Sequence, residues 1–235
     1  AIDSPGNENL RWAIGCVNSN ASLDQIVFEI NTPQTTFIDI QDPVLPTITS
    51  DNILIDGTNL GTAAGDIALY GAYLSSGSGL RHDGNNSEFR DIELIGFPGR
   101  GIRTNSSQNV VFNNVKAIDN QQNGIEINGV SVSGSLTDCE TNNNGTTGFT
   151  SVDNGLRIDN SNNITVTNHT ANSNKEDGIY TSGCADFTIV SGSVSNNDRN
   201  GLTSIMDGIN YSISNFTSNT NGLNGLEFQG GENIS

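Results

Sequence analysis

The sequence predicts an all-β fold, a right-handed parallel β-helix wound as a single-stranded solenoid, with a short capping helix at its N-terminal end. Three observations predict it. An Asn-x-x-x-Gly motif recurs five times in the second half of the chain. Apolar residues alternate with polar ones on both sides of each motif. Glycine, asparagine, aspartate and serine interrupt every repeat, and these residues favour turns over helix.

The repeat is an asparagine followed four residues later by a glycine. Successive asparagines lie 23 or 24 residues apart, except for one interval of 30. A period near 23 with short strands joined by turns is typical of a β-solenoid, in which each coil stacks on the next about 4.8 Å away. The five pairs are Asn120 and Gly124, Asn144 and Gly148, Asn174 and Gly178, Asn197 and Gly201, and Asn221 and Gly225.

Two strands are predicted in every coil. The first is anchored by an apolar residue eight positions before the asparagine, and the second begins with an apolar residue just after the glycine. Their inward side chains are expected to form one continuous core. The anchors are Phe112, Leu136, Val166, Ile189 and Ile213, and the residues after the glycines are Ile102, Ile125, Phe149, Ile179, Leu202 and Leu226.

The repeated asparagines are expected to stack into a ladder. An asparagine amide can hydrogen-bond its counterparts in the coils above and below, and its backbone tolerates the left-handed conformation that a tight turn needs. Two further polar columns are expected to satisfy the backbone of other turns. They are Asn114, Asp138, Asn168, Ser191 and Asn215, and Asn109, Asn163, Asp186, Asn210 and Asn233.

One domain is expected, in two parts. Residues 1–75 hold an N-terminal cap and the first irregular coils, and residues 76–235 hold the regular coils. The cap is a helix over 7–20 that places Leu10, Ile14 and Val17 on one side. Such a helix covers the apolar end of a solenoid, which would otherwise expose its core.

The irregular parts of the chain carry further expectations. Early strands are predicted near 25–30, 36–40, 52–56 and 66–73. A protruding loop is predicted at 150–154, where the interval between asparagines lengthens. The pattern stops in the middle of a coil, so we expect the parent chain to continue beyond Ser235 with further coils.

Charge and composition exclude several kinds of partner. The chain has 26 acidic and 9 basic residues and a net charge of −17, whereas nucleic-acid binding needs a basic surface. No run of about 18 apolar residues is present, which excludes insertion of a helix into a membrane. Three cysteines without paired spacing predict small packing residues rather than disulfides or zinc ligands.

The N-terminal segments LRWAIGCVNSN, LDQIVFEI and LPTITSDNILIDG carry a family resemblance. They resemble the N-terminal region of secreted bacterial β-helix proteins with a CSLREA-type motif, although Trp12 stands where that motif has glutamate and the Cys-Ser before Leu10 is absent. The later repeats are similar to those of pectate-lyase-like proteins. The resemblance implies a parallel β-helix that is secreted or displayed at a bacterial cell surface, and it implies no particular activity.

The second strand of each coil presents one outward side chain directly after its first apolar residue. In many proteins of the pectate-lyase-like fold this face forms a substrate groove. Arginine suits acidic sugars and an aromatic ring stacks on neutral ones, so we assign a candidate glycan-binding site here. Its residues are Arg81, Arg103, Glu126, Arg157, Asp159 and Tyr180.

No catalytic residue and no metal ligand is assigned. The polygalacturonase-like sequences Asn-Thr-Asp, Asp-Asp, Gly-His-Gly and Arg-Ile-Lys are absent. A lyase would need a base beside an arginine, and the pattern offers Tyr180 or His82. No cofactor is expected, although calcium is left open at the acidic turns 56–59 and 83–86.

We therefore expect a non-catalytic extracellular or cell-surface scaffold that is adhesive or contacts glycans. Its partner is a polysaccharide or a cell-surface glycan, with no nucleic acid and no membrane insertion. The alternative is a polysaccharide lyase or glycoside hydrolase of the pectate-lyase-like fold that acts on an acidic polysaccharide.

Overall fold

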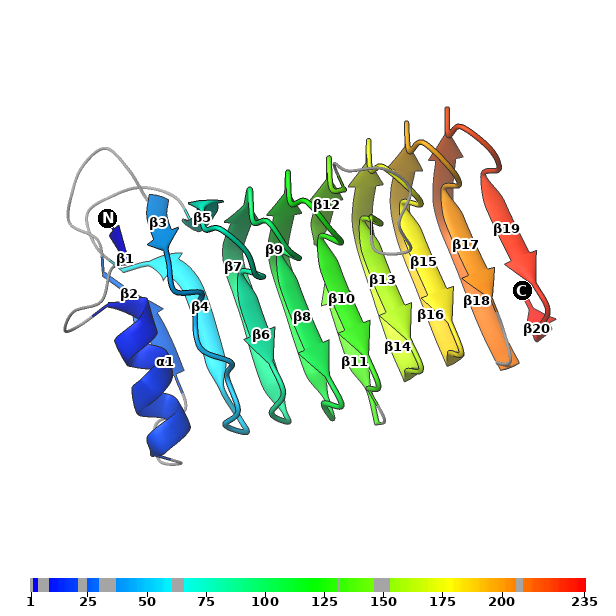
Figure 1. Ribbon diagram of the computed structural model, residues 1–235. Helices are drawn as coiled ribbons and strands as arrows, with labels where there is room; N and C mark the ends of the chain where they lie inside the picture. The colour runs from blue at the N-terminus through cyan, green and yellow to red at the C-terminus, as the bar shows by residue number, and fades with distance from the viewer. Residues whose placement is uncertain are drawn as a thin grey trace.

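The computed structural model describes residues 2–3, 9–20, 25–29, 37–60, 66–130, 132–145, 153–205 and 209–235. Its strands stack in parallel into two sheets that extend along one axis (Figure 1). This is the β-solenoid that the repeat predicts, with one short helix at its N-terminal end. The predicted loop at 150–154 lies outside the described residues, except for its last two.

The longer sheet has thirteen strands and the shorter sheet has seven. The longer sheet contains β1 (Ile2–Asp3), β2 (Gln25–Phe28), β3 (Phe37–Gln41), β4 (Leu54–Asn59), β5 (Ile67–Tyr73), β7 (Ser87–Ile95), β9 (Val110–Ile118), β11 (Gly134–Thr137), β12 (Glu140–Asn142), β14 (Asn162–Asn172), β16 (Ala185–Ser195), β18 (Ile209–Asn219) and β20 (Glu232–Ile234). The shorter sheet contains β6 (Leu80–His82), β8 (Ile102–Asn105), β10 (Ile125–Asn128), β13 (Leu156–Asp159), β15 (Ile179–Ser182), β17 (Leu202–Ile205) and β19 (Leu226–Gln229). The four strands predicted before residue 75 are present as β2 to β5, with bounds shifted by up to three residues.

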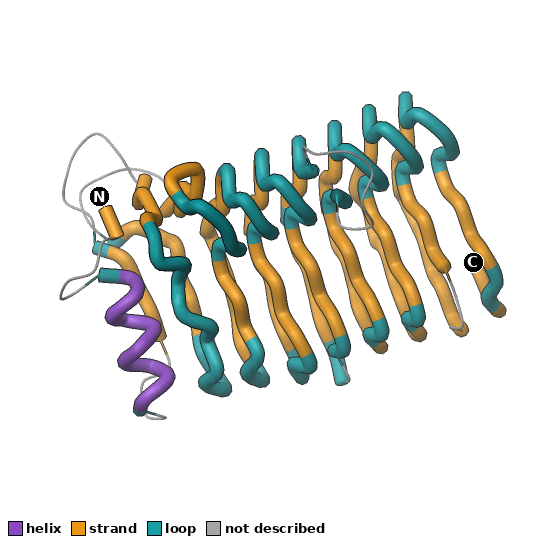
Figure 2. The backbone as a smooth tube through the Cα atoms, in the orientation of Figure 1, coloured by secondary structure: helices purple, strands orange, loops and turns teal. Residues whose placement is uncertain are grey.

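The helix α1 (Leu10–Ser19) caps the N-terminal end of the stack (Figure 2). The side chain of Asn9 accepts a hydrogen bond from the backbone nitrogen of Trp12 at 2.9 Å, which satisfies one of the free donors of the first turn. Leu10, Ile14 and Val17 are buried, as their spacing predicts. The capping helix is therefore confirmed.

Each coil passes from the shorter sheet into a long strand that bends in its middle. The bend falls on the first predicted polar column, whose members adopt φ between 50° and 64°. The second predicted column, at the preceding turn, adopts φ between 52° and 65°. Asparagine and aspartate tolerate this left-handed conformation because their short polar side chains hydrogen-bond locally. Both predicted columns therefore serve the corners of the solenoid.

The asparagine ladder is present, and its first four members are buried. Each Nδ2 donates to Oδ1 of the next asparagine at 3.0–3.1 Å, and the same oxygen accepts the preceding asparagine's backbone nitrogen at 2.9–3.1 Å. The remaining amide hydrogen reaches a backbone carbonyl, as from Asn144 to Ala117 at 2.9 Å. A buried amide is stable only when its donors and acceptors are paired in this way.

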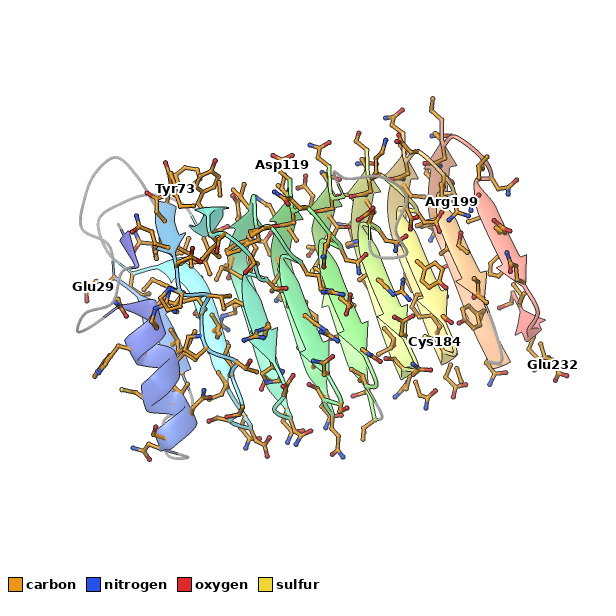
Figure 3. The ribbon with its side chains drawn as sticks, viewed as in Figure 1. Glu29, Tyr73, Asp119, Cys184, Arg199 and Glu232 are labelled. Carbon is orange, nitrogen blue, oxygen red and sulfur yellow. The ribbon has the colours of Figure 1, made fainter. Side chains whose placement is uncertain are left out.

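The prediction that the ladder asparagines themselves adopt the left-handed backbone conformation was wrong. The ladder asparagines do not adopt positive φ; the residue before each one does, with φ between 55° and 59°. Asp119 marks one such corner at the edge of the solenoid (Figure 3). The left-handed residue turns the chain outward and leaves the following asparagine pointing into the interior. These corner residues are Asp119, Asn143, Ser173, Asn196 and Thr220.

A second polar ladder, which the repeat pattern did not predict, lies directly before the glycines. In each step a backbone nitrogen donates to the side-chain oxygen of the preceding rung, at distances of 2.9–3.2 Å. The sequence does contain a pattern that could have predicted this ladder, because an Asn or Asp precedes the glycine in successive coils. Its members are Asn123, Asn154, Asp177, Asn200 and Asn224.

Glycine is needed in the glycine column because neighbouring coils approach too closely to leave room for a Cβ atom. A Cβ on Gly178 would lie 2.7 Å from Nδ2 of Asn197 and 2.8 Å from the carbonyl oxygen of Gly201. In the long coil Gly155 occupies this column, because Ile125 pairs with Leu156. The prediction that Gly148 and Phe149 fill these two positions was therefore wrong, and both lie outside the described residues.

Apolar side chains from all faces fill the interior. The predicted anchors Phe112, Leu136, Val166 and Ile189 are fully buried. Cys139 and Cys184 lie in the same core, which confirms a packing role for these two, and no disulfide forms among the cysteines, all of which the structure describes.

Candidate functional site

The outer face of the shorter sheet carries five of the six predicted site residues in one column, and Asp159 lies two residues beyond Arg157, in register with Asn128. Strand register pairs Arg81 with Arg103, Arg103 with Glu126, and Glu126 with Arg157. Tyr180 follows on the next rung. Adjacent rungs of a sheet lie about 4.8 Å apart, so these side chains form a continuous row across β6, β8, β10, β13 and β15, which are neighbouring strands in Figure 1. The column continues through Thr203 to Glu227.

Glu126 is the centre of a cluster of cations. Its Oε1 lies 3.0 Å from Nε of Arg103, and its Oε2 accepts hydrogen bonds from Arg100 and from Nδ2 of Asn123. Glu126 is only 4% exposed. Burial would be costly for an unpaired carboxylate, so the two guanidinium groups hold Glu126 and are themselves fixed by it.

Arg100 is a site residue that the sequence pattern did not predict. It lies in the turn before Gly101, where the following coils carry asparagine or aspartate. The sequence does mark this residue, because the position holds arginine here and Asn or Asp in the following coils. Its side chain reaches back to the face of the sheet because Glu126 lies on the next rung.

Arg157, Asp159 and Tyr180 form a second group two rungs beyond Arg103. Nε of Arg157 donates to Oδ2 of Asp159 at 2.6 Å, and the guanidinium carbon lies 4.6 Å from the centroid of the Tyr180 ring. Burial opposes the charged guanidinium, but the hydrogen bond and charge of Asp159 outweigh it and raise the pKa of Arg157 above its usual value. The result is a rigid cation stacked on an aromatic ring.

Arg81 begins the row, and within the described residues it has no acidic partner. Its Nε is buried without a hydrogen-bond partner. The neighbouring carboxylate of Asp83 instead accepts a hydrogen bond from Asn105 at 3.0 Å. Arg81 therefore offers donors to a ligand without first breaking an ion pair.

The opposite end of this face is acidic. Burial raises the pKa of Glu176 and of Asp177 above their usual values, and Arg199 lies 3.9 Å from Glu176, beside the upper turn of the solenoid in Figure 3. Oε2 of Glu227 accepts a hydrogen bond from Asn200 at 2.8 Å. The charge on the face thus changes from positive near β6 and β8 to negative near β19.

Both histidines point into the solenoid. His82 is fully buried, and its ring lies 5.4 Å from that of Phe89. His169 is also fully buried, with Nε2 3.0 Å from the Thr141 hydroxyl. Burial lowers the pKa of each to about 4. The expectation that His82 lies near the outer face as a base was therefore wrong, because its side chain faces inward.

In the turn at 56–59, one of the two considered for calcium, the carboxylate of Asp56 is already bound by other groups of the protein. Oδ2 of Asp56 lies 2.6 Å from Nη2 of Arg90, and Oδ1 accepts the backbone nitrogen of Thr58. A bound guanidinium competes with a cation at that carboxylate. In the described part of the chain no group of three or more His, Cys, Asp or Glu residues is placed to hold a metal ion, and no described helix is long and apolar enough to cross a membrane.

Comparison with known proteins identifies the fold. No protein-family model matches the sequence, and no curated protein matches it. Solved structures do match. A periplasmic alginate epimerase AlgG is 11% identical over 85% of this chain and 47% of its own, with a TM-score of 0.58. Its T265N T268M double mutant is 15% identical over 82% and 58%, with a TM-score of 0.51.

A phage protein shows the same likeness. The Dettilon tailspike protein gp208 is 13% identical over 83% of this chain and 42% of its own, with a TM-score of 0.54. The chain spans about half the length of these structures. At such identities the likeness shows a shared parallel β-helix and no more.

Proposed function

We propose that this chain binds an acidic polysaccharide along the outer face of the shorter sheet, as a non-catalytic scaffold outside the cytoplasm. One observation carries the proposal. The chain has only 9 basic residues and a net charge of −17, yet Arg81, Arg100, Arg103 and Arg157 lie on or beside four consecutive rungs of one face. Such a concentration of guanidinium groups favours a ligand with carboxylates.

The chemistry of the face suits a sugar chain. A guanidinium group presents five N–H donors in a planar fork that matches a carboxylate. The Tyr180 ring offers an apolar surface against which a sugar ring can pack. A row of rungs along one axis allows several such contacts to a linear polymer. The rest of the acidic surface repels polyanions and so directs them to this face.

The similar structures support the same class of ligand. One is described as an alginate epimerase, and alginate is a polymer of uronic acids; another is a phage tailspike protein. The epimerase is described as periplasmic, which supports a location outside the cytoplasm. These likenesses establish the fold, while the arginine row supplies the argument for the ligand.

The enzymatic alternative depends on Tyr180. With both histidines buried, Tyr180 beside Arg157 is the group on this face that a lyase could use for proton transfer next to a charge-neutralising cation. Turnover of polygalacturonate would give an unsaturated product that absorbs at 232 nm, or new reducing ends if the reaction is hydrolysis. Binding without either product supports the scaffold.

Calorimetric titration with oligogalacturonate and with neutral cellotetraose tests the proposal. We expect binding of the uronate to weaken as salt increases, and Arg103→Gln to weaken it about tenfold, which corresponds to one charge-assisted contact. Arg90→Gln is the matched control, because Arg90 pairs with Asp56 on the longer sheet. Equal loss in both variants, or no uronate binding by the wild type, would contradict the proposal.

A further inference from the structure

Glu126 holds two cations side by side on the outer face of the shorter sheet. Arg100 donates to its Oε2 through Nε, and Nε of Arg103 lies 3.0 Å from its Oε1. Two guanidinium groups repel each other, so without a shared carboxylate they would separate and sample many side-chain conformations. The carboxylate of Glu126 therefore fixes a pair of like charges at one point of the row.

The second polar ladder in turn anchors Glu126. Its Oε2 accepts a hydrogen bond from Nδ2 of Asn123 at 2.7 Å, and Oδ1 of Asn123 accepts the backbone nitrogen of Asn154 at 2.9 Å. Glu126 and Asn123 are both buried. A side chain that is packed and hydrogen-bonded in this way is locked in one conformation. The framework of the solenoid thus sets the position of the arginine pair.

The contact with Glu126 uses one nitrogen of each arginine and leaves the other two available. Both arginines meet the carboxylate through Nε. In the part of the chain that the structure describes, no Nη atom of Arg100 or Arg103 donates to another residue or is buried without a partner. These nitrogens therefore face solvent with their N–H donors free. Two cations against one carboxylate leave the pair with a net positive charge.

We propose that Arg100 and Arg103 form a preformed subsite for one carboxylate of the ligand, and that Glu126 is its positioning residue. A ligand carboxylate can bridge the two guanidinium groups through Nη, as Glu126 bridges them through Nε. Because the pair is ordered before the ligand arrives, binding costs little side-chain entropy. This inference rests on the proposed binding of acidic polysaccharide to this face, and it adds the anchoring point and the residue that creates it.

The inference predicts an effect opposite in sign to that of simple electrostatics. Glu126→Gln removes a negative charge from a face that binds anions, so charge alone would make binding tighter. The same substitution releases the arginine pair, and for that reason we expect binding to weaken about tenfold. Glu227→Gln is the matched control. Glu227 lies in the same column but accepts from the neutral amides of Asn200 and Gln229, so its loss should leave binding unchanged or tighter.

Calorimetric titration of the whole chain with tetragalacturonate measures both variants against the wild type. Weaker binding in Glu126→Gln alone supports the inference. Unchanged or tighter binding in Glu126→Gln, or an equal loss in Glu227→Gln, would overturn it and leave the proposed function intact. Absence of binding by the wild type would overturn the two together.

A double-mutant cycle separates positioning from a general loss of structure. We expect Arg100→Gln to weaken binding about tenfold in the wild type and less than about threefold when Glu126→Gln is already present, because the arginine is then no longer held toward the ligand. Losses that multiply independently would contradict action of Glu126 through Arg100.

Thermal unfolding shows whether each variant folds. Should Glu126→Gln fail to fold, Arg100→Gln and Arg199→Gln in the wild type decide the inference. Arg199 lies beside Glu176 at the acidic end of the face, so we expect only Arg100→Gln to weaken binding. Equal affinities in these two variants would overturn the subsite.

Discussion

Nδ2 of Asn144 donates a hydrogen bond to Oδ1 of Asn174 at 3.1 Å, although thirty residues separate the two along the chain. The neighbouring steps of the ladder span 23 or 24 residues and have the same geometry. Additional residues within one coil therefore leave the stacking of the ladder unchanged. The ladder, more than the length of any coil, sets how successive coils are placed on one another.

Replacing Asn174 by Leu is expected to lower the free energy of unfolding by about 3 kcal/mol. The change removes the bonds to Asn197 and to the carbonyl of Thr141, and each buried group left without a partner costs about 1–3 kcal/mol. Denaturant unfolding followed by circular dichroism measures the loss. Asn113→Leu, on an exposed strand position, is the control and should cost less than about 1 kcal/mol. Equal losses would show that the ladder adds little stability.

Replacing a glycine by alanine is expected to lower the free energy of unfolding at one position and to raise it at another. Gly178→Ala places a Cβ 2.7 Å from Nδ2 of Asn197, so the ladder must shift and we expect a loss of about 2 kcal/mol or more. Gly15→Ala, in helix α1, meets no atom within 4 Å and should gain about 0.5–1 kcal/mol. Thermal unfolding of both variants checks the signs. A stabilised Gly178→Ala would contradict the close approach between coils.

The buried histidines predict loss of stability in mild acid. Burial lowers the pKa of His82 and His169 to about 4, whereas the unfolded chain binds protons at its usual pKa near 6.5. The stabilisation is therefore complete above pH 6.5 and declines as the pH falls toward 4. Linkage gives about 3 kcal/mol for each histidine over this range.

Unfolding titrations of the wild type and His169→Gln at several pH values measure this effect. The difference between the two isolates His169, because the acidic groups whose pKa is raised contribute equally to both proteins. We expect the variant to lose about half as much stability between pH 6.5 and 4.5. An identical pH dependence in the two proteins would show that His169 is not held neutral by the core.

The cysteines are expected to differ in reactivity. Burial raises the pKa of Cys139 to about 12 and that of Cys184 to about 11, and both lie in the core. The thiolate is the reactive form, so these two should resist a thiol reagent in the native state and react after unfolding. Cys16 is half-buried and should react first. Rapid labelling of all three in the folded protein, followed by mass spectrometry, would contradict this order.

Much of the fold follows from the periodicity of the sequence. Strand side chains alternate with a period of two, so one inward residue such as Phe112 assigns the faces of its neighbours. The repeated glycine and asparagine align the coils, and this alignment is sufficient to place Arg103 and Glu126 in one column. The glycan-binding role of that column stays a prediction.

Other features depend on contacts between coils, which no local pattern contains. The partners of Glu126 include Arg100, twenty-six residues earlier, and the period alone did not show that this turn residue reaches the sheet. The same limit applies to Gly155, which enters the glycine column because Leu156 stacks on Ile125. A lengthened coil offers several registers, and packing selects one of them.

The sequence by itself determined the solenoid, its capping helix and the row of charges on its shorter sheet, because these depend on period and composition. Only the tertiary structure decided that the core holds His82 as a buried polar side chain, and that the left-handed corner lies one residue before each ladder asparagine. Both outcomes have one physical reason. The interior accepts a polar side chain wherever a neighbouring coil supplies its hydrogen bonds, and those partners lie one coil away in the chain.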